Sequence, residues 1–270
     1  MSHYAADLRL ALELADAADS LTLSRFQALD LVVETKPDLT PVSDADRATE
    51  VMLRARLAQE RPDDAVVGEE LGDTQGAGSG RRWILDPIDG TKNYVRGVPV
   101  WATLIALIDD GATADDAVVG VVSAPALGRR WWAARDEGAW LGGSLGGNLD
   151  GSARRLRVSE VSALPDASLS YSDRVGWPDG GIAFDALAGS CWRTRAYGDF
   201  WSHLLVAEGS IDIACEPTLS VWDVAALVAV VEEAGGRITG TAGQPVLSGG
   251  GALTTNGRLH EAVVEQLRPA

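Results

Sequence analysis

The sequence has few positive charges, few cysteines and no long apolar run. Lys and Arg together number 23 against 39 Asp and Glu, so the formal net charge of the 270 residues is −16. This excess of acid disfavours general binding to nucleic acid or to an anionic membrane, because the field of the protein repels phosphate. The longest nearly unbroken apolar stretches, Val98 to Ile108 and Val224 to Val231, are shorter than the ~20 residues that a membrane-spanning helix needs. We therefore expect neither a nucleic-acid partner nor a membrane span.

Cysteine and histidine are also scarce, and this disfavours a disulfide-rich secreted protein and an enzyme that depends on histidine. Cys191 and Cys215 do not make a disulfide framework, and charged residues interrupt the apolar pattern of the N-terminus, unlike a secretory signal. Both features favour a cytoplasmic protein with free thiols. His3, His203 and His260 are scattered along the chain, and none lies beside an acidic motif. This argues against a Ser-His-Asp hydrolase.

Helix and strand signals alternate along the first half of the chain. Apolar residues recur at helical spacing from 4 to 29, and Ser43 is placed to cap a second helix. A hydrophobic strand around residues 83–85 is predicted to run into a turn at 86–90. Further strands are predicted at 65–68, 98–108, 118–123 and 130–134, with a loose Gly-rich loop at 72–80.

The second half continues the mixed pattern. Residues 142–152 are the most Gly-rich segment, which predicts a boundary between an N-terminal half, 1–145, and a C-terminal half, 146–270. An apolar helix at 224–234 is closed by two glycines, a common helix C-terminus. Together the elements indicate a layered α/β fold. The remaining predicted elements are strands at 156–158, 167–170 and 211–214 and helices at 179–189, 200–208 and 259–267.

The segment from Trp83 to Thr91 carries two carboxylates, Asp86 and Asp89, at the end of the predicted strand. Pro87 fixes the backbone between them, and Gly90 permits a tight turn. Rigidly held oxygen ligands suit Mg²⁺, which tolerates little distortion of its octahedral geometry. Asp-Pro and Asp-Gly are also common turn dipeptides, so this segment alone is equally consistent with an ordinary turn.

Other acids occur in similar settings. Glu69 follows a short strand, and Asp223 begins the apolar helix. Taken singly, Glu69 reads as a solvated loop acid and Asp223 as a helix cap. The occurrence of these acids together, in a fixed order along the chain, is a more specific signal of a shared site than either acid alone.

Four motifs occur together in an order and spacing that resemble the inositol monophosphatase family, over a region from Lys36 to Asn256. The resemblance implies an α-β-α-β-α sandwich with the active site between two halves. It also implies a homodimer and a lithium-sensitive phosphatase that uses two or three Mg²⁺ ions. The motifs are Gly-Glu-Glu at 68–70, Asp-Pro-Ile-Asp-Gly-Thr at 86–91, Trp-Asp-Val-Ala-Ala at 222–226 and Glu-Ala-Gly-Gly at 233–236.

The resemblance also implies roles for individual residues. Asp46 and Thr91 correspond to the pair that orients and deprotonates the attacking water, with Glu69 as a further catalytic acid. The backbone N–H groups of Gly90 and Thr91 would bind phosphate. Lys36 is not assigned, because its distance from Asp46 is one residue shorter than in animal inositol phosphatases. The implied metal ligands are Glu69, Asp86, the backbone carbonyl of Ile88, Asp89 and Asp223, with Asp86 bridging two ions.

The metal motifs do not name the substrate, because the family hydrolyses several phosphate monoesters. The runs from Asp89 to Trp101 and from Tyr197 to Phe200 resemble the bacterial histidinol-phosphatase branch. Asp199 and Glu216 would suit the ammonium and imidazole of histidinol phosphate. We therefore expect hydrolysis of L-histidinol phosphate to L-histidinol, in histidine biosynthesis.

Two alternatives stay open. The first is an inositol-1-monophosphatase or another small-molecule phosphatase of the family. The second is a non-catalytic, metal-binding regulatory member, which loss of Thr91 or Asp46 would indicate; both residues are present.

The nine tryptophans are the remaining conspicuous feature of the sequence. Trp131-Trp132 and Trp140 flank predicted strands, which predicts core or interface packing. Trp101 and Trp192 are candidates for the edge of the pocket. Lys92 lies next to the phosphate motif, where contact with phosphate and a solvated position are about equally expected.

Overall fold

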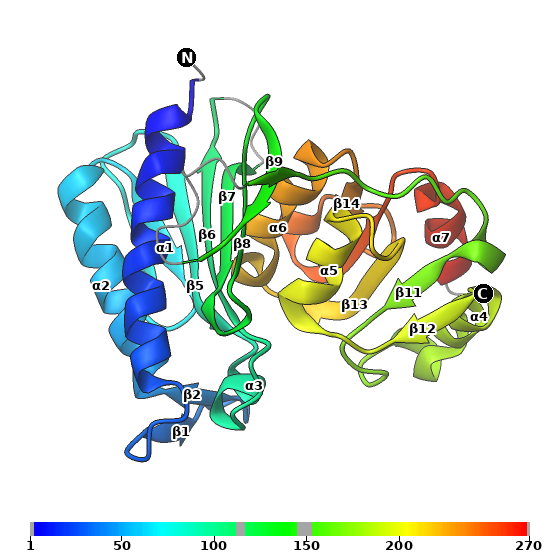
Figure 1. The fold of residues 1–270 in the computed structure, drawn as a ribbon, viewed down its shortest axis with the longest axis horizontal. Helices are drawn as coiled ribbons and strands as arrows, with labels where there is room; N and C mark the ends of the chain where they lie inside the picture. The colour runs from blue at the N-terminus through cyan, green and yellow to red at the C-terminus, as the bar shows by residue number, and fades with distance from the viewer. Residues whose placement is uncertain (1–2, 112–116, 145–152, 269–270) are drawn as a thin grey trace.

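The chain forms five layers: helices, sheet, helices, sheet, helices (Figure 1). The computed structural model describes residues 3–111, 117–144 and 153–268. Two helices cover the outer face of an eight-stranded sheet, two more lie between the sheets, and two cover the outer face of a five-stranded sheet. This confirms the predicted α-β-α-β-α sandwich. Among the described helices, none combines the length and apolar character needed to span a bilayer.

The eight-stranded sheet is antiparallel except where β3 runs parallel to β5. Its central strands β6 and β7 are buried along almost their whole length, as their continuous apolar sequences require for strands covered on both faces. In spatial order the strands are β10 (Arg154–Arg155), β9 (Gly138–Gly142), β8 (Arg129–Ala134), β7 (Ala117–Ala124), β6 (Ala102–Asp109), β5 (Arg81–Asp89), β3 (Ala65–Gly68) and β4 (Gly72–Thr74).

The five-stranded sheet mixes both orientations. β11 runs parallel to β12 and β13, whereas β15 runs antiparallel to β13 and β14. A separate hairpin of β1 (Val33–Thr35) and β2 (Pro41–Ser43) precedes the first sheet. The strands of the second sheet are, in spatial order, β12 (Arg193–Arg195), β11 (Ser168–Ser170), β13 (Ile213–Leu219), β15 (Gly250–Thr255) and β14 (Arg237–Thr239).

The helices follow the apolar patterns of the sequence. α1 and α2 pack on the first sheet, α5 and α6 lie between the sheets, and α4 and α7 pack on the second sheet. Short 3-10 turns occur at 125–127, 164–166, 178–181 and 246–248. The α-helices are α1 (Ala5–Arg25), α2 (Asp44–Glu60), α3 (Thr91–Val95), α4 (Ile182–Ser190), α5 (Asp199–Ala207), α6 (Val221–Glu233) and α7 (His260–Leu267).

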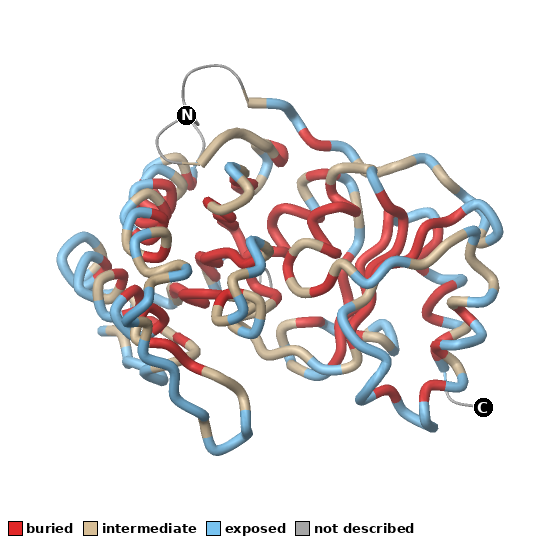
Figure 2. The backbone as a smooth tube through the Cα atoms, turned by 60° about the horizontal axis from the view of Figure 1, so that its bottom comes forward, coloured by how far each residue is buried: buried red, intermediate tan, exposed pale blue. Residues whose placement is uncertain are grey.

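Helix α6 joins the two sheets into one core. Its residues from Val224 to Val231 are buried in a cluster with Trp131 of the first sheet and Ala252 of the second, the red interior of Figure 2. Helix and sheet approach closely at Gly120, where a Cβ atom would overlap the carbonyl oxygen of Ala226. The helix of the C-terminal half is therefore held against the sheet of the N-terminal half.

Several predicted boundaries in the first half are wrong. Helix α1 ends at Arg25 and not at 29, because the chain turns at Phe26 and Gln27 takes a positive φ of 60°. The loop predicted at 72–80 begins with β4, which pairs with β3. The turn predicted at 86–90 is instead the end of β5, which continues to Asp89 through a bulge opposite β6. The backbone at Phe26 and Gln27 decides the first case, and strand pairing with β3 or β6 decides the other two.

In the second half, the strand predicted at 156–158 is wrong. The strand is β10, at Arg154–Arg155. Leu156 and Val158 instead donate single backbone hydrogen bonds to Ala139 and Ala234, respectively. The predicted boundary at 145/146 lies among residues 145–152, outside the described part of the chain.

Candidate active site

A cavity of about 540 Å³ lies where the hairpin, the end of β5 and the starts of α3, α5 and α6 converge. Elements from both halves thus contribute to one site. The cavity is lined by Lys36, Asp38, Thr40, Pro41, Glu69, Asp86, Ile88, Asp89, Gly90, Thr91, Lys92, Asp199, Thr218, Leu219, Ser220, Trp222 and Asp223.

The bulge of β5 holds the first two carboxylates in place. The Ile88 N–H donates to Asp86 Oδ1 at 3.0 Å, and the Thr103 hydroxyl donates to the Pro87 carbonyl at 2.8 Å. Asp89 Oδ2 accepts a 2.8 Å hydrogen bond from the Phe200 N–H of α5. Strand β6 and helix α5 therefore fix the segment that the sequence alone leaves as a candidate turn.

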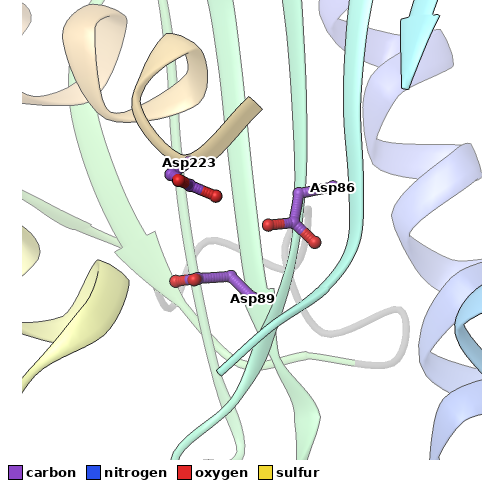
Figure 3. A group of neighbouring side chains, drawn as sticks. All are labelled: Asp86, Asp89 and Asp223. Carbon is purple, nitrogen blue, oxygen red and sulfur yellow. The ribbon is translucent and has the colours of Figure 1, made fainter. Parts of the chain in front are cut away.

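Asp223 reaches the same point from α6. It is the third residue of a capping box, in which the Ser220 N–H donates to Asp223 Oδ2 at 2.7 Å. The N-cap is therefore Ser220 and not Asp223 as predicted, because the helix begins at Val221, and the capping box holds the Asp223 carboxylate at the cavity. Oxygens of Asp86, Asp89 and Asp223 lie within 4.8 Å of one another (Figure 3).

This cluster of three aspartates is held together against its own repulsion. Burial, and then the negative charges of neighbouring acids, raises the pKa of all three carboxyls. Within the described residues, no Lys or Arg forms an ion pair with any of them.

Glu69 lines the same cavity, but its carboxylate is paired. Lys36 Nζ lies 2.7 Å from Glu69 Oε1 and 2.6 Å from Glu70 Oε1. Among the described acids, the close group contains the three aspartates and not Glu69. Lys36 was left unassigned on its spacing from Asp46, yet the hairpin carries it to the acids, and only the tertiary structure reveals this.

Thr91 lines the cavity, and Asp46, which is absent from the described lining, lies next to it. Thr91 Oγ1 is 3.0 Å from the Ile88 carbonyl oxygen and 3.4 Å from Asp46 Oδ1. Asp46 Oδ2 accepts hydrogen bonds from the N–H (2.8 Å) and the hydroxyl (2.5 Å) of Ser43 in a capping box. Burial of the Asp46 side chain raises the pKa of its carboxyl to about 6. The Thr91 hydroxyl and the Asp46 carboxylate, the pair assigned by resemblance, are therefore close enough to share a proton.

Gly90 begins α3 in a conformation that suits glycine, with φ of 82°. A Cβ atom there would lie 3.0 Å from the Val100 carbonyl and 3.3 Å from Asp199 Oδ2. Gly90 and Thr91 both line the cavity, and backbone N–H groups at the start of a helix have no acceptor within it. Lys92 also lines the cavity.

The two acids predicted to contact the substrate differ in position. Asp199 lines the cavity, and Asn93 Nδ2 donates to its Oδ2 at 3.0 Å. Glu216 is 3% exposed, is absent from the described lining, and accepts a 2.7 Å hydrogen bond from the Ser172 hydroxyl. Burial raises the pKa of the Glu216 carboxyl to about 8. Glu216 thus lies behind the wall to which Asp199 belongs.

Some of the tryptophans occupy the core as predicted, but those predicted at the edge of the cavity lie elsewhere. Trp131 and Trp132 are buried in the core, which confirms their predicted packing. Trp101 is wholly buried and Trp192 is exposed; neither belongs to the described cavity lining, so their predicted place at its edge is wrong. Trp222 lines the cavity instead, and its position beside Asp223 in the sequence was the available signal.

Comparison with known proteins places this geometry in a family. The sequence matches the model of the inositol monophosphatase family over residues 5–270. The chain belongs to the inositol monophosphatase family. Membership confirms the predicted class of enzyme, a phosphatase that acts on phosphate monoesters.

This inositol monophosphatase family protein has close relatives and a shared fold. It is 57% identical to the histidinol-phosphatase of Streptomyces coelicolor, over 99% of this chain and 98% of that protein. It is 56% identical to the histidinol-phosphatase of Mycobacterium tuberculosis, over 99% of each. The crystal structure of extragenic suppressor protein suhB from Bartonella henselae superposes with a TM-score of 0.86 at 27% identity, covering 98% of this chain and 100% of that one.

The aspartate cluster of this family protein fits a divalent metal ion. Its donors are all hard oxygens, the ligand type that such ions prefer. The ions would also offset the negative charge of the neighbouring acids, which adds to burial in raising the pKa of the three carboxyls.

Proposed function

We propose that the protein hydrolyses L-histidinol phosphate to L-histidinol and inorganic phosphate with Mg²⁺. One observation carries the proposal: the cavity holds both the aspartate cluster and Asp199, an acid with no Lys or Arg ion pair among the described residues. A phosphate monoester with a cationic organic part matches this arrangement, because its phosphate would meet metal ions at the cluster and its cation would meet Asp199. Two full-length relatives above 55% identity named histidinol-phosphatase support the same substrate.

The proposed metal ligands are Asp86, Asp89 and Asp223 of the cluster, joined by Glu69 and the Ile88 carbonyl. Bound Mg²⁺ would neutralise phosphoryl oxygens, lower the pKa of a water molecule and stabilise the leaving alkoxide. Lys36 holds Glu69 beside the cluster. Two or three ions in each site are proposed from the family resemblance.

The chain's own groups orient the attack. Because the Thr91 hydroxyl donates toward Ile88 or Asp46, its oxygen is available to accept a hydrogen bond from the attacking water. Asp46, whose pKa is about 6, can hold the proton that leaves along this path. The water oxygen bonds to phosphorus as the ester P–O bond breaks, and the N–H groups of Gly90 and Thr91 hold the phosphoryl oxygens.

The organic part of the substrate is proposed to meet Asp199. Its carboxylate can accept a charge-assisted hydrogen bond from the ammonium or the imidazolium. Glu216 lies behind this wall, where burial and then the charge of Asp199 raise the pKa of its carboxyl to about 8. Asp199 would discriminate against a neutral polyol phosphate, because such an ester offers no cation to its carboxylate.

The setting of this enzyme is proposed as well. The free thiols of Cys191 and Cys215 and the names of the relatives support a cytoplasmic enzyme of histidine biosynthesis. The family resemblance supports a homodimer and a division into halves 1–145 and 146–270. The first half would supply most metal ligands, and the second would supply Asp223 and the substrate-contacting acids.

A substrate panel in Mg²⁺ tests the proposal. We expect kcat/KM to be highest for L-histidinol phosphate, compared with inositol 1-phosphate and glycerol 2-phosphate. Higher kcat/KM for inositol 1-phosphate would replace this proposal with an inositol monophosphatase. Absence of hydrolysis with every ester would instead support a regulatory, metal-binding protein.

A further inference from the structure

The two acids near the substrate end of the cavity are joined by one hydroxyl group. Ser172 Oγ accepts a 2.8 Å hydrogen bond from the Asp199 N–H. The same hydroxyl donates to Glu216 Oε1 at 2.7 Å. Asp199 and Glu216 come from α5 and β13, and Ser172 lies just beyond the end of β11. A single exposed serine in the loop after β11 therefore links the start of α5 to β13.

The backbone at Asp199 needs such support. Asp199 has φ of 49°, in the left-handed region that non-glycine residues rarely occupy. Gly198 precedes it with φ of 80°, and a Cβ there would lie only 3.2 Å from Ser172 Oγ. Ser172 is thus packed directly against the segment whose unusual conformation turns Asp199 into the cavity.

The Asp199 side chain is fixed from the opposite side. Asn93 Nδ2 donates both to Asp199 Oδ2 at 3.0 Å and to the Val100 carbonyl at 2.9 Å. Asn93 belongs to α3, the helix that begins with Thr91. Asp199 is therefore held by its backbone from the second half and by its carboxylate from the first.

We propose that Ser172 is a positioning residue for substrate selectivity: its hydroxyl holds Asp199 and Glu216 in the arrangement that favours phosphate esters with a cationic organic part. This inference rests on the proposed function. Ser172 does not line the described cavity, so it acts through Asp199 and not by touching substrate. A neutral ester, which gains little from Asp199, should be indifferent to the Ser172 hydroxyl.

The test compares Ser172→Ala with the parent in the Mg²⁺-loaded enzyme. We expect KM for L-histidinol phosphate to rise about tenfold, roughly the effect of one hydrogen bond, with kcat nearly unchanged. The kcat/KM for glycerol 2-phosphate should stay close to the parent value. Ser172→Thr, which keeps the hydroxyl, should restore much of the KM. Ser190→Ala is the matched control, since the Ser190 hydroxyl bonds to Leu187 within α4, in an outer layer.

A double-mutant cycle with Asp199→Asn separates positioning from a general structural effect. If Ser172 acts through Asp199, Ser172→Ala should add little to the KM of the Asp199→Asn variant. Fully additive effects, or equal losses for both esters, would overturn the role of Ser172 while leaving the proposed function in place. A parent enzyme that prefers the neutral ester would overturn the proposed function itself, and the selectivity role with it.

Discussion

Two groups of buried carboxylates in this protein show opposite ways of accommodating negative charge. In the first, Asp19 of α1 is fully buried, and its Oδ2 lies 2.6 Å from Nη2 of the fully buried Arg130 and 2.8 Å from the Ser123 hydroxyl. In the second, Asp86, Asp89 and Asp223 converge with no Lys or Arg ion pair in the described chain. Both groups are bounded by the same eight-stranded sheet.

The difference separates a structural role from a chemical one. The Asp19 group has its counter-charge inside the protein, so it needs nothing from solution. The aspartate cluster has no positive side chain paired with it among the described residues. Burial and then repulsion raise the pKa of its carboxyls, which favours the binding of protons or metal ions. The three aspartates, which have no Lys or Arg ion pair among the described residues, therefore form a group that could hold an external cation.

The largest expected effect comes from removing one member of the aspartate cluster. Asp89→Asn should lower kcat with Mg²⁺ by about a thousandfold or more, because a metal ligand is lost. The fold should persist, since the change also removes repulsion. Steady-state kinetics and circular dichroism check both expectations. Asp30→Asn, at an exposed ion pair with Arg25, should behave as the parent; unchanged turnover of Asp89→Asn would refute the metal site.

Breaking the buried ion pair of Asp19 and Arg130 should lower the stability of the protein and leave catalysis unchanged. Asp19→Asn leaves Arg130 with a poorer partner, and removing one side of a buried pair costs about 3–5 kcal/mol. Denaturant unfolding measures this loss, while kcat of the folded enzyme should match the parent. Asp16→Asn is the control, because Asp16 pairs with the same Arg130 from a partly exposed position and should cost about 1 kcal/mol or less. Equal costs for both variants would contradict the comparison.

Mg²⁺ itself should stabilise the protein through the aspartate cluster. At a concentration 100 times its Kd, a ligand that binds only the folded state adds about 2.7 kcal/mol. This corresponds to a Tm increase of about 5–10 °C for a chain of this size. Thermal melts in EDTA and in Mg²⁺, with NaCl at matched ionic strength, measure it. The Asp89→Asn variant should lose most of the increase, and an equal increase in both proteins would place the ion elsewhere.

The smallest effect concerns a buried group that avoids charge altogether. His203 of α5 is 1% exposed, its Nδ1 lies 2.7 Å from Thr254 Oγ1, and burial lowers its pKa to about 4. The unfolded chain, with an ordinary pKa near 6.5, takes up a proton first, so stability falls as the pH drops from about 6.5 toward 4. The loss attributable to His203 is about 2 kcal/mol at pH 5.

Parallel unfolding of the parent and His203→Gln in EDTA, at pH 7 and pH 5, isolates this contribution, because the metal-site acids titrate equally in both. The variant should lose less stability on acidification. His3→Gln, at an exposed position, should keep the parent dependence. Identical slopes for all three proteins would show that His203 does not couple protonation to folding.

Local sequence signals predicted the parts of the site that depend on neighbours in the chain. Ser43 caps α2 as predicted, and its capping box includes Asp46. The second helix was predicted to be capped by Asp223, whereas Ser220 caps it and Asp223 completes the box. The strand that delivers Asp86 and Asp89 was likewise predicted from its apolar residues. These features follow from hydrogen bonds and periodicity over a few residues, which a sequence displays directly.

Contacts between distant segments were not predictable in this way. The Lys36–Glu69 ion pair joins the hairpin to the end of β3, and Ser172 meets Asp199 across the second sheet layer. The strand β9 was missed, and the turn expected at 86–90 proved to be paired with β6. The ion pair and the Ser172 contact join segments far apart in the sequence, and no local pattern encodes the register of β5 against β6. Strand β9 instead follows β8 directly in a short hairpin.

The placement of Asp223 on α6 has a consequence for the newly made chain. Ribosomes synthesise Glu69, Asp86 and Asp89 more than 130 residues before Asp223, and α6 packs on the first sheet only after it has emerged. A nascent or truncated chain therefore lacks the third aspartate of the cluster, as well as the Phe200 N–H that holds Asp89. With the site proposed above, we expect catalytic competence only once Asp223 has been synthesised, and incomplete chains should not hydrolyse phosphate esters.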